Sequence, residues 1–190
     1  QMIKDSALYQ EHRSKNIATD AEKKLLPKGG IGALQKASKE LKKRLRFVLA
    51  AEPTLKGLYR IQWWIALKLF TQVPFRNTFA TITIGGDKGN VLETPRKGNF
   101  KFVMRDFKNS DKLGERTVPL SRAISMALRK FLKYRSGLVK HKHLFTGYHG
   151  DPMTRAGFGK ALQNTYDDVL GARLGSRIIR ITHANSETDA

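Results

Sequence analysis

The stretch that decides the fold spans residues 100–121 and reads FKFVMRDFKNSDKLGERTVPLS. Its first five residues follow a period-two pattern, which is typical of a strand with one buried face. Residues 109–115 have the polar, charged and glycine-containing composition of a hairpin loop, and residues 116–120 are extended again. Ser121 is a favoured helix N-cap. The stretch therefore predicts a β-hairpin that leads directly into a helix.

Helical patterns surround this hairpin on both sides. Helices are expected over residues 5–26, 33–51, 54–72, 121–134 and 154–169, with a last helix from Ser176. The helix over residues 54–72 is apolar nearly all round, so we expect it in the middle of the domain. Another strand is expected over residues 79–84, followed by a glycine-rich turn. The sequence therefore predicts an α+β fold that is mostly helical, with a small antiparallel sheet between helices.

Length and composition are those of one domain. The chain has 190 residues, of which 40% are hydrophobic, so it can bury a core of ordinary size. It has no cysteine, which excludes disulfides, zinc ribbons and thiol catalysis. There is no apolar run of about 18 residues, and residues 1–15 are polar and charged. We therefore expect no membrane partner and no signal peptide, and an intracellular location.

The charge balance points to a polyanionic partner. Lysine and arginine number 36 against 16 aspartate and glutamate residues, which leaves a formal net charge of +20. A domain with this charge repels itself unless a polyanion neutralises it, and nucleic acid is the commonest such partner. From charge alone, a ribosome-like or nucleoid-packing protein is an equally good interpretation.

Basic residues at the junctions between expected elements are candidates for holding a phosphodiester. Transfer at phosphorus develops charge on the non-bridging oxygens, which planar guanidinium groups bind, and it needs a proton donor for the leaving oxygen. Arg76 follows a buried helix and a proline turn, and Lys108 lies at the rim of the hairpin loop. Arg177 and Arg180 are three residues apart on the last helix and so share a face.

Other chemistries lack support in the sequence. The acidic residues are scattered, so a two-metal nuclease site is not expected. No motif indicates a Ser-His-Asp triad or a phosphate-binding P-loop. His141 and His143 have no evident third metal ligand, so a solvated loop is the better interpretation. We therefore expect neither a metal nor another cofactor.

The order of these segments resembles the catalytic domain of the tyrosine-recombinase, or phage-integrase, family. The sequence PFRN at residues 74–77 is similar to the segment that carries the family's first catalytic arginine. Residues 107–121 resemble its hairpin lysine and the strand that follows, and residues 144–154 resemble the passage before its next helix. The sequence RIIR at residues 177–180 lies where the family has its His-x-x-Arg box. The resemblance covers residues 54–190.

The resemblance implies an integrase-like catalytic fold and a cofactor-independent reaction. Arg76 and Arg180 would clamp the scissile phosphate, and Lys108 would reach the minor groove and protonate the leaving 5′-oxygen. Arg177 would replace the box histidine. The parent protein would then cleave and rejoin DNA strands through a 3′-phosphotyrosyl intermediate, in site-specific recombination or integration by a virus or mobile element. Its partners would be double-stranded DNA and further copies of itself on DNA, in the nucleoid, the cytoplasm or a host nucleus.

Three departures from the family pattern accompany the resemblance. Phe79 stands where the family often has an acidic residue, and Arg177 cannot serve as a general base because a guanidinium stays protonated in proteins. No tyrosine follows the box, although the family places its nucleophile there. We therefore expect one catalytic domain over residues 1–190, truncated at its C-terminal end, that binds DNA without cleaving it. Residues 1–52 would be a helical lead-in to the catalytic core at residues 53–190, and Tyr166 is the one candidate for a displaced nucleophile.

Further basic side chains are expected to contact DNA. They are Lys43, Arg44, Arg105, Lys112, Arg116, Arg155, Lys160 and His183.

Four alternatives remain open at the level of the sequence. Telomere resolvases and type IB topoisomerases use the same groups without a metal. A non-catalytic DNA-binding protein would need only the basic surface. An RNA-binding domain would use its sheet as a platform, with Phe100 and Phe102 as stacking residues.

Overall fold

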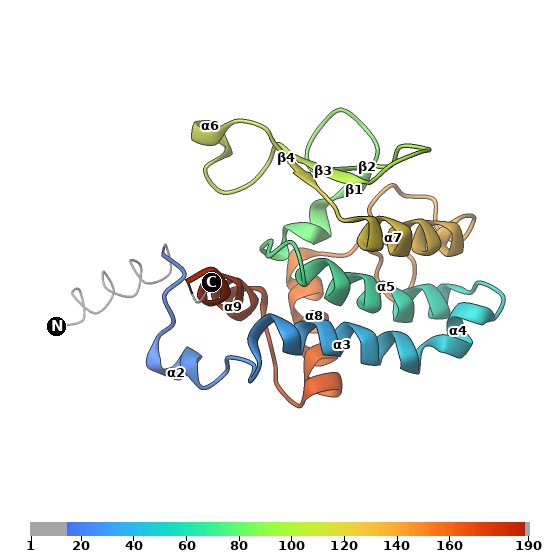
Figure 1. Ribbon diagram of the computed structural model, residues 1–190. Coiled ribbons are helices and arrows are strands. Elements are labelled where there is room, and N and C mark those ends of the chain that lie inside the picture. Colours follow the sequence, from blue (N-terminus) through green and yellow to red (C-terminus); the bar gives the residue numbers. More distant parts are fainter. Residues whose placement is uncertain (1–14, 189–190) are drawn as a thin grey trace.

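Figure 1 shows the computed structural model of the chain, which describes residues 15–188. Helices form the larger part, and a small sheet lies to one side of them (Figure 1). The fold is therefore α+β with a helical majority, as the sequence predicts. The helices are α2 (Asp20–Lys23), α3 (Gly30–Arg44), α4 (Arg46–Ala50), α5 (Leu55–Phe70), the 3-10 helix η1 (Asn77–Thr81), α6 (Ser110–Leu113), α7 (Arg122–Arg135), α8 (Arg155–Leu170) and α9 (Ser176–Thr188).

Helix α5 is the centre of the helical part, between α3 and α7 (Figure 1). Its N-terminus is capped by Thr54, whose hydroxyl accepts a hydrogen bond from the Gly57 N–H at 3.0 Å. Gly57 also lets Tyr134 at the end of α7 approach closely, because a Cβ at this position would lie 2.0 Å from the tyrosine hydroxyl. Trp63 and Trp64 are 5% and 2% exposed. The predicted central helix, with its tryptophans in the core, is confirmed.

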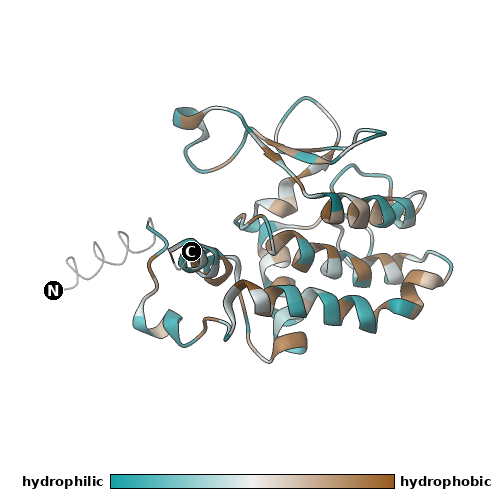
Figure 2. Ribbon diagram, in the orientation of Figure 1, coloured by the Kyte–Doolittle hydropathy of each residue, from teal (hydrophilic) through white to brown (hydrophobic). Residues whose placement is uncertain are grey.

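Hydropathy follows this arrangement. Hydrophobic residues run along α5, whereas the outward side of α3 carries mostly hydrophilic residues (Figure 2). Residues 15–188 contain no helix that is long and apolar enough to cross a membrane.

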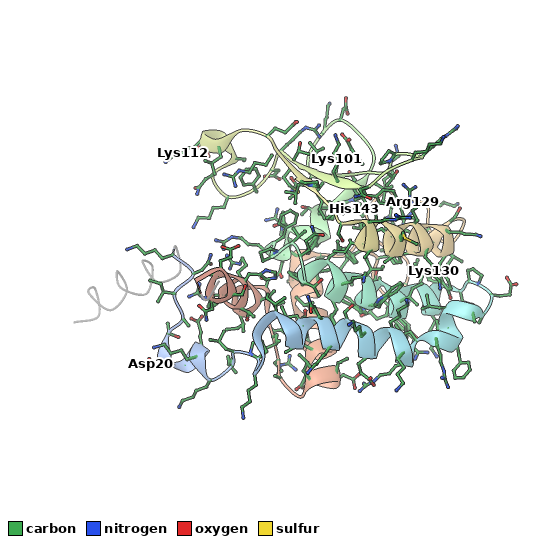
Figure 3. All side chains as sticks on the ribbon, viewed as in Figure 1. Asp20, Lys101, Lys112, Arg129, Lys130 and His143 are labelled. Atoms are coloured by element: carbon green, nitrogen blue, oxygen red, sulfur yellow. The ribbon has the colours of Figure 1, made fainter. Side chains whose placement is uncertain are left out.

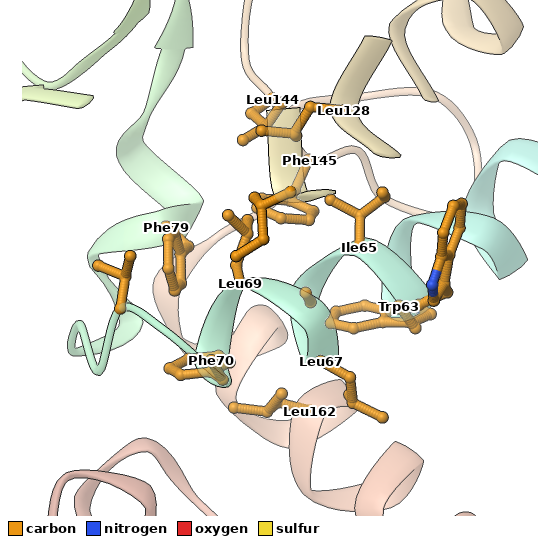
Figure 4. Close-up of a cluster of buried hydrophobic side chains, with 14 of the residues drawn as sticks. Trp63, Ile65, Leu67, Leu69, Phe70, Phe79, Leu128, Leu144, Phe145 and Leu162 are labelled. Atoms are coloured by element: carbon orange, nitrogen blue, oxygen red, sulfur yellow. The ribbon is translucent and has the colours of Figure 1, made fainter. Parts of the chain in front are cut away.

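An aromatic cluster that includes Phe79 joins the helices to the sheet, and Figure 4 shows Phe79, Phe70 and Phe145 among its buried side chains. The ring centroid of Phe79 is 4.9 Å from that of Phe70, 5.8 Å from that of Phe102 and 6.2 Å from that of Phe158. Of residues 79–84, expected as a strand, the first three belong to the 3-10 helix η1, and only Thr83–Ile84 form a strand, β1. The tight turn buries both Phe79 and Ala80, which an alternating strand could not do on one face.

The sheet is mixed, whereas the sequence predicted an antiparallel one. The described residues form one sheet in the order β1-β2-β3-β4, with β2 at Val91–Glu93, β3 at Lys101–Met104 and β4 at Arg116–Pro119. Strands β2, β3 and β4 pair antiparallel, but β1 pairs parallel with β2. Glycines 85, 86 and 89 all have positive φ, so residues 85–90 can loop over and return the chain in the same direction. The expected β3–β4 hairpin forms, and its loop contains the short helix α6.

Asn90 fixes the base of this hairpin. Its side chain is 2% exposed, and its Oδ1 accepts hydrogen bonds from the backbone N–H groups of Arg105 (3.0 Å) and Asp106 (2.9 Å). Its Nδ2 donates to the Asp106 carbonyl at 2.7 Å and to the Thr81 hydroxyl at 3.3 Å. The hairpin arm therefore starts from a hydrogen-bonded point two residues before Lys108.

The predicted helices differ from the structure mainly near the N-terminus. The helix expected over residues 5–26 lies partly outside the described residues, and residues 15–19 are not helical. Thr19 starts α2 instead: its hydroxyl accepts from the Glu22 N–H at 3.3 Å, while its own N–H donates to the Glu22 carboxylate at 3.0 Å. The helix expected over residues 33–51 is interrupted at Leu45, between α3 and α4. The helices capped by Ser121 and Thr154 are confirmed.

Candidate functional site

A basic cavity of about 510 Å³ lies between the hairpin base, η1 and the first turns of α8 and α9. We call it the clamp cavity. Five cationic side chains line it against one carboxylate, that of Asp106. The cations are Arg76, Lys108, Arg155, Arg177 and Arg180.

A second cavity of about 290 Å³ shares part of this lining. It contains Arg76, Lys108 and Arg180 again, together with Arg116 and the ring of Phe107. Three residues that are far apart in the sequence thus line both cavities. The structure brings Arg76, Lys108 and Arg180 together at one basic concavity.

Arg76 is held at the junction between α5 and η1. Val73 is 3% exposed, and Pro74 fixes its own backbone before Arg76 takes an extended conformation with φ −68° and ψ −172°. The next residue, Asn77, packs against α8 where Gly159 has no side chain: a Cβ there would lie 2.6 Å from the Asn77 Nδ2. This close approach fixes η1 against α8, and the side chain of Arg76 is exposed at the cavity.

Lys108 lies on the hairpin arm between β3 and α6. Its side chain is exposed, and the next residue, Asn109, has a left-handed backbone with φ 72°. The Phe107 carbonyl accepts a hydrogen bond from the Ser110 N–H at 2.9 Å, which turns the chain sharply. The guanidinium of Arg116 lies 5.8 Å from the Phe107 ring centroid. The lysine is therefore presented by a tight turn that β4 supports from the other side.

Arg177 is bound by the N-terminal segment through an ion pair. Its Nε donates to the Glu22 Oε1 at 2.5 Å and its Nη2 to the Oε2 at 3.1 Å, while Nη2 also donates to the Ile17 carbonyl at 3.2 Å. The side chains of Arg177 and Glu22 are only 16% and 17% exposed. Hydrogen bonding from the guanidinium holds the pKa of Glu22 below its ordinary value. Sequence reasoning missed Glu22, which offsets the charge of one of the five cavity cations.

Arg180 lies one turn further along α9. Its side chain is partly buried, and its Nε donates to the Ser176 carbonyl at 3.4 Å. This contact directs the Nε of Arg180 back along the helix toward the α9 N-terminus. Arg177 and Arg180 thus share the helix face that lines the clamp cavity, as their spacing predicts.

The other proposed DNA contacts are spread over the surface. Arg155 and Arg116 line the two cavities. Arg105 is paired with Glu115 at 2.6 Å, and Arg44 with Glu40 and Asp168 at 3.1 Å each, in both cases at exposed positions. His183 lies away from the cavities, with its Nε2 2.7 Å from the Phe70 carbonyl. Exposed positions on α3, α6 and α8 are occupied by Lys43, Lys112 and Lys160.

Lys112 extends the basic surface along the hairpin. Figure 3 shows it on α6, at the outer end of the arm.

The structure overturns the hypothesis that Tyr166 is a displaced nucleophile. Its side chain is 0% exposed, and burial raises the pKa of its hydroxyl well above the ordinary value. A buried phenol that resists ionisation cannot attack a DNA phosphate. Tyr59, Tyr134 and Tyr148 do not line the clamp cavity, and Tyr9 lies outside the described residues.

Replacing Tyr166 with phenylalanine is expected to preserve the fold. Among the residues that the structure describes, the buried Tyr166 hydroxyl has no hydrogen-bond partner, and leaving such a group unpaired costs about 1 kcal/mol or more. We therefore expect Y166F to raise the free energy of unfolding by about 1 kcal/mol, measured by urea denaturation. A loss of stability instead would show that the hydroxyl has a partner, and a loss of DNA cleavage would restore it as a catalytic candidate.

The structure also bears on the RNA-binding alternative and on the pair of histidines at positions 141 and 143. Phe100 and Phe102 are 2% and 0% exposed, so neither can stack on RNA bases, and that prediction is wrong. Burial and the nearby charge of Arg135 lower the pKa of His141. Among residues 15–188, no group of three or more histidine or acidic side chains is arranged to bind a metal.

The site has to be interpreted from its own geometry. Comparison with protein-family models, with curated proteins and with solved structures gives no significant match for this chain.

Proposed function

We propose that this chain provides the phosphate-binding site of an enzyme that cleaves and rejoins DNA strands in the manner of tyrosine recombinases. The observation that supports this most directly is the shared cavity of Arg76, Lys108 and Arg180. These are the three residues that the sequence resemblance assigns to the scissile phosphate. The domain would have an integrase-like catalytic fold, and its partner would be double-stranded DNA inside a cell.

Each side chain has a distinct role in the proposed reaction. Arg76 and Arg180 bind the non-bridging oxygens of the phosphate, where negative charge increases in the transition state. A tyrosine hydroxyl attacks phosphorus and loses its proton to solvent, the bond from phosphorus to the 5′-oxygen breaks, and Lys108 donates a proton to that oxygen. The tyrosine must come from outside the described residues. Rejoining is the reverse: the 5′-hydroxyl attacks and returns its proton to Lys108, the phosphotyrosyl bond breaks, and the released tyrosine oxygen takes a proton from solvent.

Arg177 supplies charge rather than a base. A guanidinium stays protonated throughout, so it can only stabilise the anionic transition state. Its ion pair with Glu22 reduces this contribution but fixes the position of the guanidinium. We therefore assign Arg177 a supporting electrostatic role beside the two clamp arginines.

A non-catalytic DNA-binding role is the second candidate. It is favoured by the position of the described tyrosines, none of which lines the clamp cavity. Telomere resolution and type IB topoisomerase activity share the proposed chemistry and belong to the first candidate. Strand cleavage by the natural protein that contains this chain separates the two, because only the first requires it.

Binding of this chain to duplex DNA is expected to depend steeply on salt and little on sequence. Each phosphate contact releases condensed counterions, so the logarithm of the affinity should fall with the logarithm of salt concentration by about 0.9 per phosphate. Fluorescence anisotropy with labelled duplexes of unrelated sequence, over a salt series, measures both properties. An affinity that is insensitive to salt would contradict any nucleic-acid function.

A further inference from the structure

A third cavity, of about 400 Å³, lies where α3, the end of α5 and the start of α7 meet. We call it the lysine pocket. Lys39 from α3 and Lys68 from α5 line it, together with Ser38, Gln72 and Ala123. It shares no lining residue with the clamp cavity.

The lysine pocket is positively charged without an internal counterion. No carboxylate lines it, and neither lysine forms an ion pair with any residue of the described part of the chain. Lys42 adds a third charge nearby, with its ammonium 5.5 Å from the Trp64 ring centroid. Burial, and then the charges of Lys42 and Lys39, lower the pKa of Lys68. Mutual repulsion of this kind is relieved when an anion binds.

Uncharged hydrogen-bond donors accompany the lysines. The Ser38 side chain is 5% exposed, and among the described residues its hydroxyl has no hydrogen-bond partner. Ala123 is the second residue of α7, where backbone N–H groups lack partners within the helix. Ser121 caps only the Ile124 N–H, at 3.2 Å. Hydroxyl, backbone and ammonium donors thus face one cavity, which is the donor set that a phosphate group requires.

We propose that the lysine pocket binds a backbone phosphate of the same DNA segment whose scissile phosphate occupies the clamp cavity. This proposal rests on the proposed function. Gln72 of the pocket is joined to Arg76 by only three residues, so their Cα atoms lie at most about 14 Å apart. A DNA strand advances about 3.4 Å per nucleotide along its axis. The two sites are therefore within reach of phosphates a few nucleotides apart.

The test removes the two charges while keeping the apolar stems. The double variant K39M/K68M retains the packing of the side chains and is expected to lower the salt slope of duplex binding by about 0.9, the contribution of one phosphate. The matched control is K130M, which removes an exposed lysine of α7 away from the pocket (Figure 3) and should leave the slope unchanged. Thermal unfolding of each variant confirms that the chain is folded. If K39M/K68M unfolds, S38A, which removes the unpaired hydroxyl and leaves the charges, replaces it and should weaken binding relative to K130M.

A second measurement identifies the source of the phosphate. The pKa of the Lys68 ammonium, followed by NMR, is expected to rise when duplex DNA is added. A rise with inorganic phosphate but not with DNA would overturn the proposal, as would equal salt slopes for K39M/K68M and K130M. If only the lysine pocket is wrongly assigned, R76A and R180A still slow cleavage strongly. If the proposed function is wrong, those two variants leave cleavage intact.

Discussion

Replacing Arg76 or Arg180 with alanine is expected to slow DNA strand cleavage by the natural protein by about 100- to 1000-fold, the usual cost of losing one transition-state donor. Both guanidinium groups line the clamp cavity, where they would bind the charge that develops on the phosphate oxygens. Duplex affinity should change by no more than a few-fold, because many other basic residues would contact the backbone in the proposed complex. Cleavage is measured on a labelled duplex in single-turnover conditions, and affinity by anisotropy.

Conservative variants separate the shape of the guanidinium from its charge. R76K and R180K keep the positive charge but lose the planar pair of donors, so they should bind duplex DNA like the wild type and recover little of the cleavage rate. The control is R96A, which removes an exposed arginine from the loop between β2 and β3 and should leave cleavage unchanged. Equal cleavage rates for R76A, R180A and R96A would contradict the assignment of Arg76 and Arg180 to the scissile phosphate.

Replacing Glu22 with glutamine is expected to lower the free energy of unfolding by about 3 kcal/mol, because it leaves a mostly buried guanidinium without its counterion. Arg177 and Glu22 are 16% and 17% exposed, and the two carboxylate oxygens accept from Nε and Nη2 along one edge of the guanidinium. The matched control is E40Q, which breaks the pair with Arg44, where both side chains are more than 40% exposed. An exposed pair of this kind contributes about 0.5 kcal/mol.

The destabilisation by E22Q should depend on pH in one direction. The pKa of Glu22 is lowered from 4.5 in the folded protein, so the ion pair contributes fully above pH 4.5 and its contribution is lost as the pH falls through the folded pKa. The difference in stability between the wild type and E22Q should therefore be constant near neutral pH and shrink below pH 4.5. Urea denaturation across this range measures it. A difference that grows on acidification would contradict the role of the pair.

The helices could be predicted from the sequence because their signals are local. Ser121 and Thr154 are good N-caps followed by periodic apolar residues, and both start the helices they predict. Only the last two residues of the strand expected over residues 79–84 form one, because burial of Phe79 among five other aromatic rings outweighs β propensity at the start of the range. Strand β2 has only three residues, too few to produce a pattern.

Residues of the candidate site could be predicted from the sequence only where their position between expected helices and strands singled them out. Arg76, Lys108 and Arg180 were selected by their junctions and spacing, and they line one cavity. Glu22 was not predicted as part of the site, because its partner Arg177 is 155 positions away and pairing at that separation leaves no local signal in the sequence. One indication was present: Thr19 and Glu22 have the spacing of a capping box, which predicts a helix start inside the range that was expected to be one long helix.

The hydrogen bonds of Asn90 have a consequence for how this protein can evolve. They hold the backbone of Arg105 and Asp106 directly before Lys108, whereas residues 109–115 beyond it are mostly exposed and make few contacts with the rest of the molecule. Exposed loop tips accept insertions and substitutions far more readily than the segments that anchor them. The tip can therefore diversify between lineages, and with it the contacts that it would make to DNA in the proposed function, while the lysine that would serve the chemistry stays in place.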